Sequence, residues 1–168
     1  MHMRKSTFRT RNGFTIIEML IVVTILAMLA GILIPVLETE MDRAADSRRA
    51  SDLKTVQAAV ESYYRVQGTY PTTADVWQGN APNFGGFGYD AAGYIPGMVP
   101  DHLQSLPKDP SNEFPNATDG GYMYRSNGSD FKMVIYHCPN SFPTGNPFFD
   151  PARPNTGWQV SSPGAYNW

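Results

Sequence analysis

Cysteine is nearly absent from this sequence, which has only Cys138 among its 168 residues. A single cysteine cannot form an intramolecular disulfide, so any folded part must be held together by its hydrophobic core. Charged residues are also scarce, at 17%, whereas hydrophobic residues make up 42%, and 14 prolines and 15 glycines are present. This composition excludes a disulfide-stapled scaffold and predicts an ordered, loop-rich domain rather than a disordered chain.

Basic charge is scarce beyond the amino terminus. Residues 1–13 contain no acid and four basic residues, namely Arg4, Lys5, Arg9 and Arg11. The rest of the chain is left with nine of the 13 basic residues against 15 acidic ones, a balance of about −6. Only a short basic cluster, between residues 43 and 54, interrupts this acidic character. The charge balance therefore predicts no nucleic-acid partner.

A long apolar run follows the basic leader and covers residues 14–37, with Glu18 as its only strongly polar residue. About 20 apolar residues are enough to cross the roughly 30 Å core of a bilayer, so this run predicts one membrane span. Basic residues precede the run and acidic residues follow it. The positive-inside rule then keeps the amino end in the cytoplasm and places the carboxyl-terminal part outside it.

Glu18 within this run admits three interpretations. A cleavable secretory signal has an apolar region of about 7–15 residues before a small-x-small site, but this run is longer and its LAMLAG segment makes a poor site. A plain signal anchor fits the length but gives Glu18 no role, although an intramembrane carboxylate costs about 2.5–3.5 kcal/mol and usually has a partner. In the third interpretation the chain is cut between Gly13 and Phe14. The new α-amino group of Phe14 then pairs with Glu18 of a neighbouring copy and sets the axial register.

The stretch KSTFRTRNGFTIIEMLIVVTILAMLAGILIPVL resembles the class III leader and first helix of type IV pilins and type II secretion pseudopilins. The likeness combines a basic leader, Gly13 before the cut, aromatic Phe14, Glu18 as the fifth residue after the cut, and the apolar helix. It is strong through about Pro71 and patchy from there to Tyr124. YP at 70–71 and LPKDP at 106–110 resemble major pseudopilins and related pilins, and LPKDP mildly favours the pseudopilus. The likeness is absent from the proline-rich segment 139–157.

The resemblance implies a processing route and a set of partners. A prepilin peptidase would cleave between Gly13 and Phe14, and Phe14 would be N-methylated. The subunit would then leave the inner membrane for a homo-oligomeric helical filament, driven by an assembly ATPase and a platform protein. The filament would be periplasmic in a secretion pseudopilus and extracellular in a pilus.

Pro35 lies inside the predicted helix, where a proline removes one hydrogen bond and clashes with the preceding turn, at a cost of about 3 kcal/mol or more. One interpretation is an ordinary kink of a membrane helix, which neighbouring helices tolerate. The resemblance implies the other, in which the segment from Gly31 to Pro35 loosens during extraction from the membrane and makes the filament extensible. The sequence leaves both open.

The helix is expected to continue to Gln67, because no stop signal interrupts it. One apolar stripe at helical spacing is expected along its second half, formed by Leu53, Val56, Val60, Tyr63 and Tyr64. Gly68 is the predicted end of the helix. We therefore expect a leader at 1–13, a membrane and filament-core helix at 14–37, an amphipathic continuation at 38–68 and a head at 69–168.

The head is expected to contain a small antiparallel sheet on which the stripe docks. Two β-rich runs, at 122–125 and 131–138, are joined through Asn127-Gly128, a strong hairpin signal, and GWQVSS near the end is a candidate third strand. About 50 irregular residues separate helix and sheet, a length that usually marks a functional or partner-ordered loop. The expected fold is a pilin-like α+β structure, with a long amino-terminal helix packed on the sheet.

No catalytic or metal constellation stands out. His137 and Cys138 are adjacent, so on a strand they would point to opposite faces, and a buried thiol is the default expectation. The aromatic residues near the GGFG segment, Phe84, Phe87, Tyr89 and Tyr94, are expected to serve packing or subunit contacts. No cofactor is expected. Weak calcium candidates lie together in one loop, although solvated turn residues are the better interpretation: Asp109, Asn112, Glu113 and Asp119.

The sequence thus predicts a non-enzymatic filament subunit, with a slight preference for a type II secretion pseudopilus over a type IV pilus. The alternative from another class is a membrane-anchored monomer that binds a ligand through its aromatic and glycine-rich loop. Such a monomer would have no use for Glu18.

Overall fold

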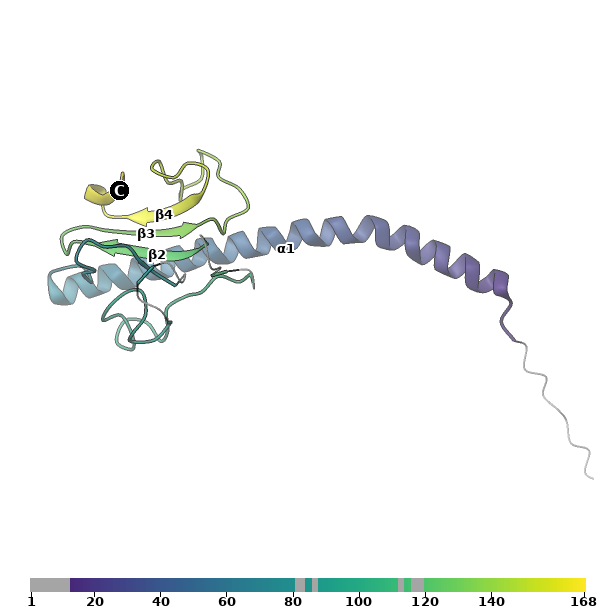
Figure 1. The fold of residues 1–168 in the computed structure, drawn as a ribbon, viewed down its shortest axis with the longest axis horizontal. Coiled ribbons are helices and arrows are strands. Elements are labelled where there is room, and N and C mark those ends of the chain that lie inside the picture. Colours follow the sequence, from purple (N-terminus) through teal and green to yellow (C-terminus); the bar gives the residue numbers. More distant parts are fainter. Residues whose placement is uncertain (1–12, 81–83, 86–87, 112–113, 116–119) are drawn as a thin grey trace, which may run out of the picture. The chain divides into compact units, whose positions relative to one another are not determined.

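The computed structural model describes residues 13–80, 84–85, 88–111, 114–115 and 120–168. The chain divides into two compact units between Glu40 and Met41. Helix α1 (Ile16–Gln67) contributes to both units. The second unit, called the head below, also contains β1 (Gln78–Gly79), β2 (Gly121–Ser126), β3 (Phe131–Tyr136), β4 (Gly157–Ser161) and a short 3₁₀ helix at Pro163–Ala165 (Figure 1).

Local signals define both ends of α1, which begins at Ile16 rather than at the predicted Phe14 and ends at Gln67 as predicted. At its start, the Thr15 hydroxyl accepts a hydrogen bond from the Glu18 amide, while the Thr15 amide donates to the Glu18 carboxylate, which together make a capping box. At its end, Gly68 adopts a φ of +75° and its amide donates to Tyr64. Glycine is favoured in this left-handed conformation because it has no Cβ. The predicted continuous helix is thereby confirmed.

The four strands form one antiparallel sheet in the order β1-β2-β3-β4, and Figure 1 labels β2, β3 and β4 side by side. The hairpin of β2 and β3 pairs Ser126 with Phe131, which leaves a loop of four residues from Asn127 to Asp130. The Asn127 side chain accepts hydrogen bonds from the amides of Ser129 and Asp130, and Gly128 has a φ of +91°. The predicted hairpin is therefore confirmed, with a longer turn than a two-residue Asn-Gly loop.

The carboxyl-terminal half of α1 packs on one face of this sheet. Leu53, Val56 and Val60 are fully buried, and they share one core with Phe131, Met133 and Ile135 of β3. The predicted stripe and its docking partner are thus confirmed. The stripe ends sooner than expected, because Tyr64 is exposed and stacks on Tyr70.

The long segment between α1 and β2 belongs to the core of the head. Tyr94, Ile95, Met98 and Leu106 are buried within the same cluster. The segment also contributes β1, which the sequence analysis did not predict and which pairs with β2. Two residues of strand carry too little periodicity to be detected in a sequence.

The predicted end of the 131–138 strand at Cys138 was wrong. Strand β3 ends at Tyr136, and His137 has a φ of +56°, which takes the chain out of the extended conformation. The argument that placed His137 and Cys138 on opposite faces of a strand therefore fails. The expected buried thiol is nevertheless confirmed, since Cys138 is 3% exposed.

Candidate assembly site

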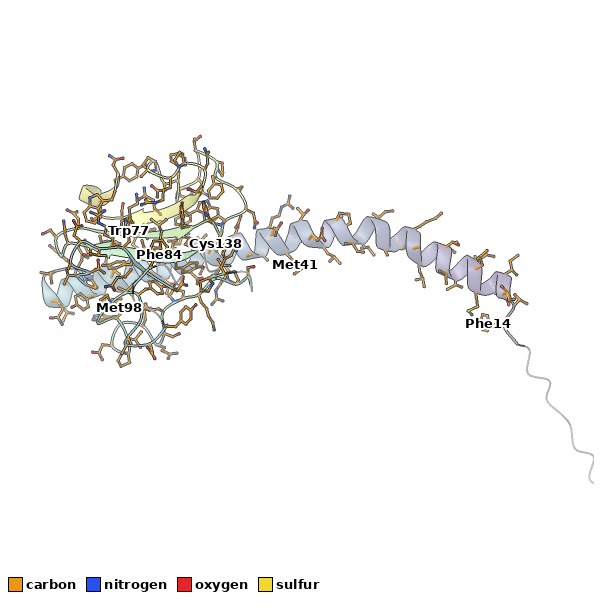
Figure 2. The ribbon with its side chains drawn as sticks, in the orientation of Figure 1. Phe14, Met41, Trp77, Phe84, Met98 and Cys138 are labelled. Carbon is orange, nitrogen blue, oxygen red and sulfur yellow. The ribbon has the colours of Figure 1, made fainter. Side chains whose placement is uncertain are left out.

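The first unit is a helix with an uncovered apolar surface. Its large apolar side chains from Phe14 to Leu37 are all exposed. Figure 2 shows these side chains projecting outward from the helix. Helix α1 is also long and apolar enough, by length and composition, to cross a membrane. Burying apolar surface yields about 25 cal/mol per Å², so a surface of this kind favours insertion into lipid or packing against other helices.

Glu18 is the acidic residue within this apolar surface, and Thr15 holds its carboxylate. One oxygen, Oε2, accepts hydrogen bonds from the Thr15 amide at 2.8 Å and from the Thr15 hydroxyl at 2.6 Å. The carboxylate therefore lies at the amino end of α1, where the helix dipole also favours negative charge. Thr15 was not singled out from the sequence, although the Thr-x-x-Glu spacing of a capping box was present there.

Gly13 and Phe14 precede the helix outside any helix or strand, and both are exposed. A Cβ added at Gly13 would meet nothing within 4 Å, so the described structure itself places no steric demand on glycine at this position. A requirement for glycine here would have to come from a processing enzyme. The structure thus brings Thr15 and Glu18 together at the start of α1 and leaves Gly13 and Phe14 exposed immediately before them.

Pro35 lies within α1, and the helix continues on both sides of it. The Thr39 hydroxyl donates to the Pro35 carbonyl at 3.0 Å, so a side chain supplements the main-chain bonding near the proline. Gly31 has open space around it.

Asp109, one of the weak calcium candidates, belongs to a buried ion pair. Its two oxygens accept hydrogen bonds from Arg49 at 2.7 and 2.8 Å, and the Arg49 guanidinium also donates to Asp46. A bidentate arginine occupies the lone pairs that a calcium ion would need. Asn112, Glu113 and Asp119 lie outside the described residues, and within the described part of the chain no three histidine, cysteine, aspartate or glutamate side chains gather as for a metal.

Asp52 of α1 is a second buried acid of the head. It accepts hydrogen bonds from the Tyr122 hydroxyl at 2.9 Å and from Arg48 at 3.2 Å. Burial raises the pKa of the Asp52 carboxyl, while the bonds from Tyr122 and Arg48 oppose that rise. These contacts fasten the helix to β2, and they take no part in the Glu18 site.

A third buried charge, Lys132 of β3, also escaped sequence analysis. Its ammonium donates to Asp150 at 2.8 Å and to the main-chain oxygens of Tyr166 and Trp168, and neither Lys132 nor Asp150 is exposed to solvent. Desolvation lowers the pKa of Lys132, although Asp150 counteracts the effect. All three ammonium protons have acceptors, so this cluster is a structural tie across the outer face of the sheet.

Two aromatic residues of the long loop, Tyr89 and Tyr94, pack in or against the core of the head. Tyr94 is fully buried and its hydroxyl donates to the Pro107 carbonyl at 2.8 Å. Tyr89 is half-buried beneath the Lys108 ammonium, 5.3 Å from its ring. Phe84, labelled in Figure 2, is also half-buried, and Phe87 lies outside the described residues. The predicted packing role is confirmed for Tyr94.

The fold and this amino-terminal arrangement define a pilin-like class of protein, in which a long apolar helix carries an α+β head. Residues 8–34 match the prokaryotic N-terminal methylation motif. The chain is similar to the type II secretion system core protein G of Klebsiella pneumoniae, with 31% identity over 60% of this chain and 69% of the relative. It is also similar to the core protein G of Aeromonas hydrophila, with 27% identity over 61% of this chain and 68% of the relative. The type IV major pilin protein PilA of Myxococcus xanthus is 38% identical over 44% of this chain and 34% of its own length.

The chain belongs to the family of type IV pilins and type II secretion pseudopilins. The resemblance inferred from the leader is thereby confirmed, and the family is one of structural proteins rather than enzymes. The chain spans less than half the length of some relatives, such as 46% of the core G protein of Pseudomonas aeruginosa. No solved structure matches the chain significantly.

Proposed function

We propose that this protein is a filament subunit, made as a single-pass inner-membrane precursor and cut between Gly13 and Phe14 by a prepilin peptidase. Residues 1–13 are the leader, residues 14–37 span the membrane and later form the filament core, residues 38–68 continue the helix, and residues 69–168 complete the head. The observation that carries the proposal is the uncovered apolar helix with a single acid held at its amino end.

Glu18 acts, in this proposal, as the register signal. Before cleavage its carboxylate is satisfied by Thr15, which lowers the cost of placing it near the membrane. After cleavage, N-methylated Phe14 carries a positive α-amine, and an incoming Glu18 pairs with the Phe14 amine of a neighbouring copy. Because such a pairing is strong only in a low-dielectric surrounding and at one axial offset, it selects one stacking of helices.

Pro35 is proposed to mark the place where the helix loosens during extraction, with an ATPase and a platform protein driving assembly. A type II secretion pseudopilus is slightly preferred because LPKDP at 106–110 is similar to major pseudopilins. The similarity to a type IV major pilin supports a surface pilus as the second candidate. Deletion strains for either system, complemented with this chain, distinguish the two by restoration of secretion or of surface pili.

The test of assembly is Glu18→Ala, compared with Glu38→Ala as a control at another exposed acid of the first unit. We expect Glu18→Ala to insert into the membrane and to be processed normally, yet to yield few or no filaments by electron microscopy of the sheared fraction. Normal filaments from Glu18→Ala would overturn the register role. Amino-terminal mass spectrometry must also find a chain that starts at N-methylated Phe14, because an intact Met1 in cells with an active prepilin peptidase contradicts the processing step.

A further inference from the structure

Strand β4 lies at one edge of the sheet (Figure 1). Its register with β3 and the hydrogen bond from the Ser162 amide to Phe131 determine which main-chain groups point inward. In an antiparallel ladder the bonded pairs alternate, so Trp158 and Val160 direct their main-chain groups to β3. Gln159 and Ser161 therefore direct theirs to the open side of the sheet.

Only half of this open side is covered. A fifth strand begins where Phe149 bridges to Trp158 and the Gln159 amide donates to the Phe148 carbonyl at 2.7 Å. The covering chain then turns away, because the Phe148 amide is bound by the Asn146 side chain and Pro147 has no amide hydrogen. The carbonyl of Gln159 and the amide of Ser161 are left without a hydrogen-bond partner in the described parts of the chain.

A cavity of about 470 Å³ lies at the uncovered edge. Gln159, Val160 and Ser161 form one wall. The other lining residues come from α1, from the loop before β4 and from the carboxyl-terminal segment, namely Lys54, Gln57, Thr144, Asn146, Pro147, Phe148, Phe149 and Tyr166. Ligand sites occupy about 300–1,000 Å³, so the volume is sufficient for a short peptide segment.

The charge of the lining indicates what would fit. Lys54 is exposed, its ammonium lies 5.8 Å from the Phe148 ring, and it has no ion pair among the described residues. The lining contains no carboxylate. An occupant with an acidic side chain is therefore complementary to Lys54, while Val160 and Phe148 offer apolar contacts to its neighbours.

We propose that the open edge of β4 binds an extended, acidic segment of a partner protein, which continues the incipient fifth strand over Gln159–Ser161. The partner's main chain would donate to the Gln159 carbonyl and accept from the Ser161 amide, as in strand addition to a sheet edge. A side chain of aspartate or glutamate would meet Lys54. This binding uses no residue of the first unit, so failure of the peptide to bind would leave the proposed register role of Glu18 unaffected.

The experiment uses the full chain in detergent micelles and two short labelled peptides of alternating valine and threonine. One peptide carries a central glutamate and the other a central lysine. Binding is followed by fluorescence anisotropy, and protection of the Ser161 amide is followed by hydrogen exchange. We expect the glutamate peptide to bind more tightly and to slow exchange at Ser161.

Two variants separate the charge from the edge. Lys54→Glu should reverse the preference between the peptides, whereas Arg65→Glu, a charge reversal on the exposed last turn of α1 away from the cavity, should not. Ser161→Pro removes the outward amide but leaves the β3–β4 ladder intact, because this amide does not face β3. We expect Ser161→Pro to weaken binding about three- to tenfold, the value of one hydrogen bond.

Three outcomes would overturn the proposal. The first is failure of the glutamate peptide to bind at millimolar concentration. The second is binding that neither Lys54→Glu nor Ser161→Pro alters. The third is a Ser161 amide that becomes protected in assembled filaments without peptide, because the edge would then be covered by a neighbouring copy.

Discussion

Two regions of α1 differ in whether their apolar side chains are exposed or buried. Up to Leu37, the large apolar side chains are exposed; from Leu53 to Val60, the apolar stripe is buried under the sheet. The charged residues differ as well. Among the described residues, Glu18 in the first region is held by its neighbour Thr15, whereas Arg49 and Asp52 in the second region are buried among partners from distant segments. The head is therefore complete by itself, and the first region requires lipid or other helices.

The largest effect is expected from a substitution that removes the lysine from the buried Lys132–Asp150 ion pair of the head. Lys132→Met leaves Asp150 buried, with the partly buried Arg153 guanidinium and the Ala152 amide as its remaining partners. Removing one partner of a buried ion pair costs about 3–5 kcal/mol, so the free energy of unfolding should fall by about that amount. Denaturant unfolding monitored by fluorescence of Trp158 measures it.

A second substitution at Asp150 controls for this effect. Lys132→Met combined with Asp150→Asn also removes the buried carboxylate that has lost its lysine, and should recover part of the lost stability. If Lys132→Met alone leaves the unfolding midpoint unchanged, the buried pair is not a structural tie.

A matched pair of leucines tests the two regions directly. Leu53→Ala removes a fully buried side chain and should lower the free energy of unfolding of the head by about 2–5 kcal/mol. Leu33→Ala, at a side chain that is 55% exposed, should leave head unfolding unchanged. Equal effects in denaturant unfolding of the full chain in micelles would contradict the distinction.

The pH dependence of the head offers a smaller effect with a definite sign. Burial raises the pKa of Asp52 above its ordinary value of 3.8, so the folded state binds this proton more tightly than the unfolded state. The resulting stability is fully present below pH 3.8 and is lost as the pH rises through the folded pKa. Asp52→Asn should therefore flatten this decline, and thermal unfolding between pH 3 and 7 measures it.

Asp75 is the control of opposite sign. A hydrogen bond from Arg125 lowers the pKa of the exposed Asp75 carboxyl, so its contribution is present above the ordinary value and is lost as the pH falls through the folded pKa. Asp75→Asn should reduce acid sensitivity where Asp52→Asn does not. Identical pH profiles for the two variants would refute the assignment.

The smallest effect is expected from chemical labelling of the single thiol, Cys138. Burial raises the pKa of Cys138, and its thiol donates to the Tyr136 carbonyl at 3.1 Å. Because the thiolate is the reactive form, Cys138 should resist iodoacetamide in the folded head and react once the head unfolds. Mass spectrometry of labelled samples across a denaturant series should give the same midpoint as fluorescence. Rapid labelling in native conditions would show that the thiol is accessible.

Local signals explain why much of the fold was predictable. The stop at Gly68 and the Asn127-Gly128 turn, both predicted, each depend on a few adjacent residues. The cap formed by Thr15 and Glu18 is equally local, although the sequence analysis missed it. The stripe and the three longer strands depend on periodicity within one element. Strand β1 and the end of β3 at Tyr136 escaped because two residues of strand carry no period and a positive φ at His137 has no distinctive sequence signal.

The sequence alone determined the regions that follow from short-range chemistry: an apolar run long enough to span a membrane, one acid near its start, a helix with defined ends and a hairpin. Only the tertiary structure decided which charges are buried together, because Arg49 and Asp109 are 60 positions apart and meet only when the loop folds over the helix. It also decided that the edge of β4 stays half open, since this depends on where Pro147 turns the neighbouring chain away.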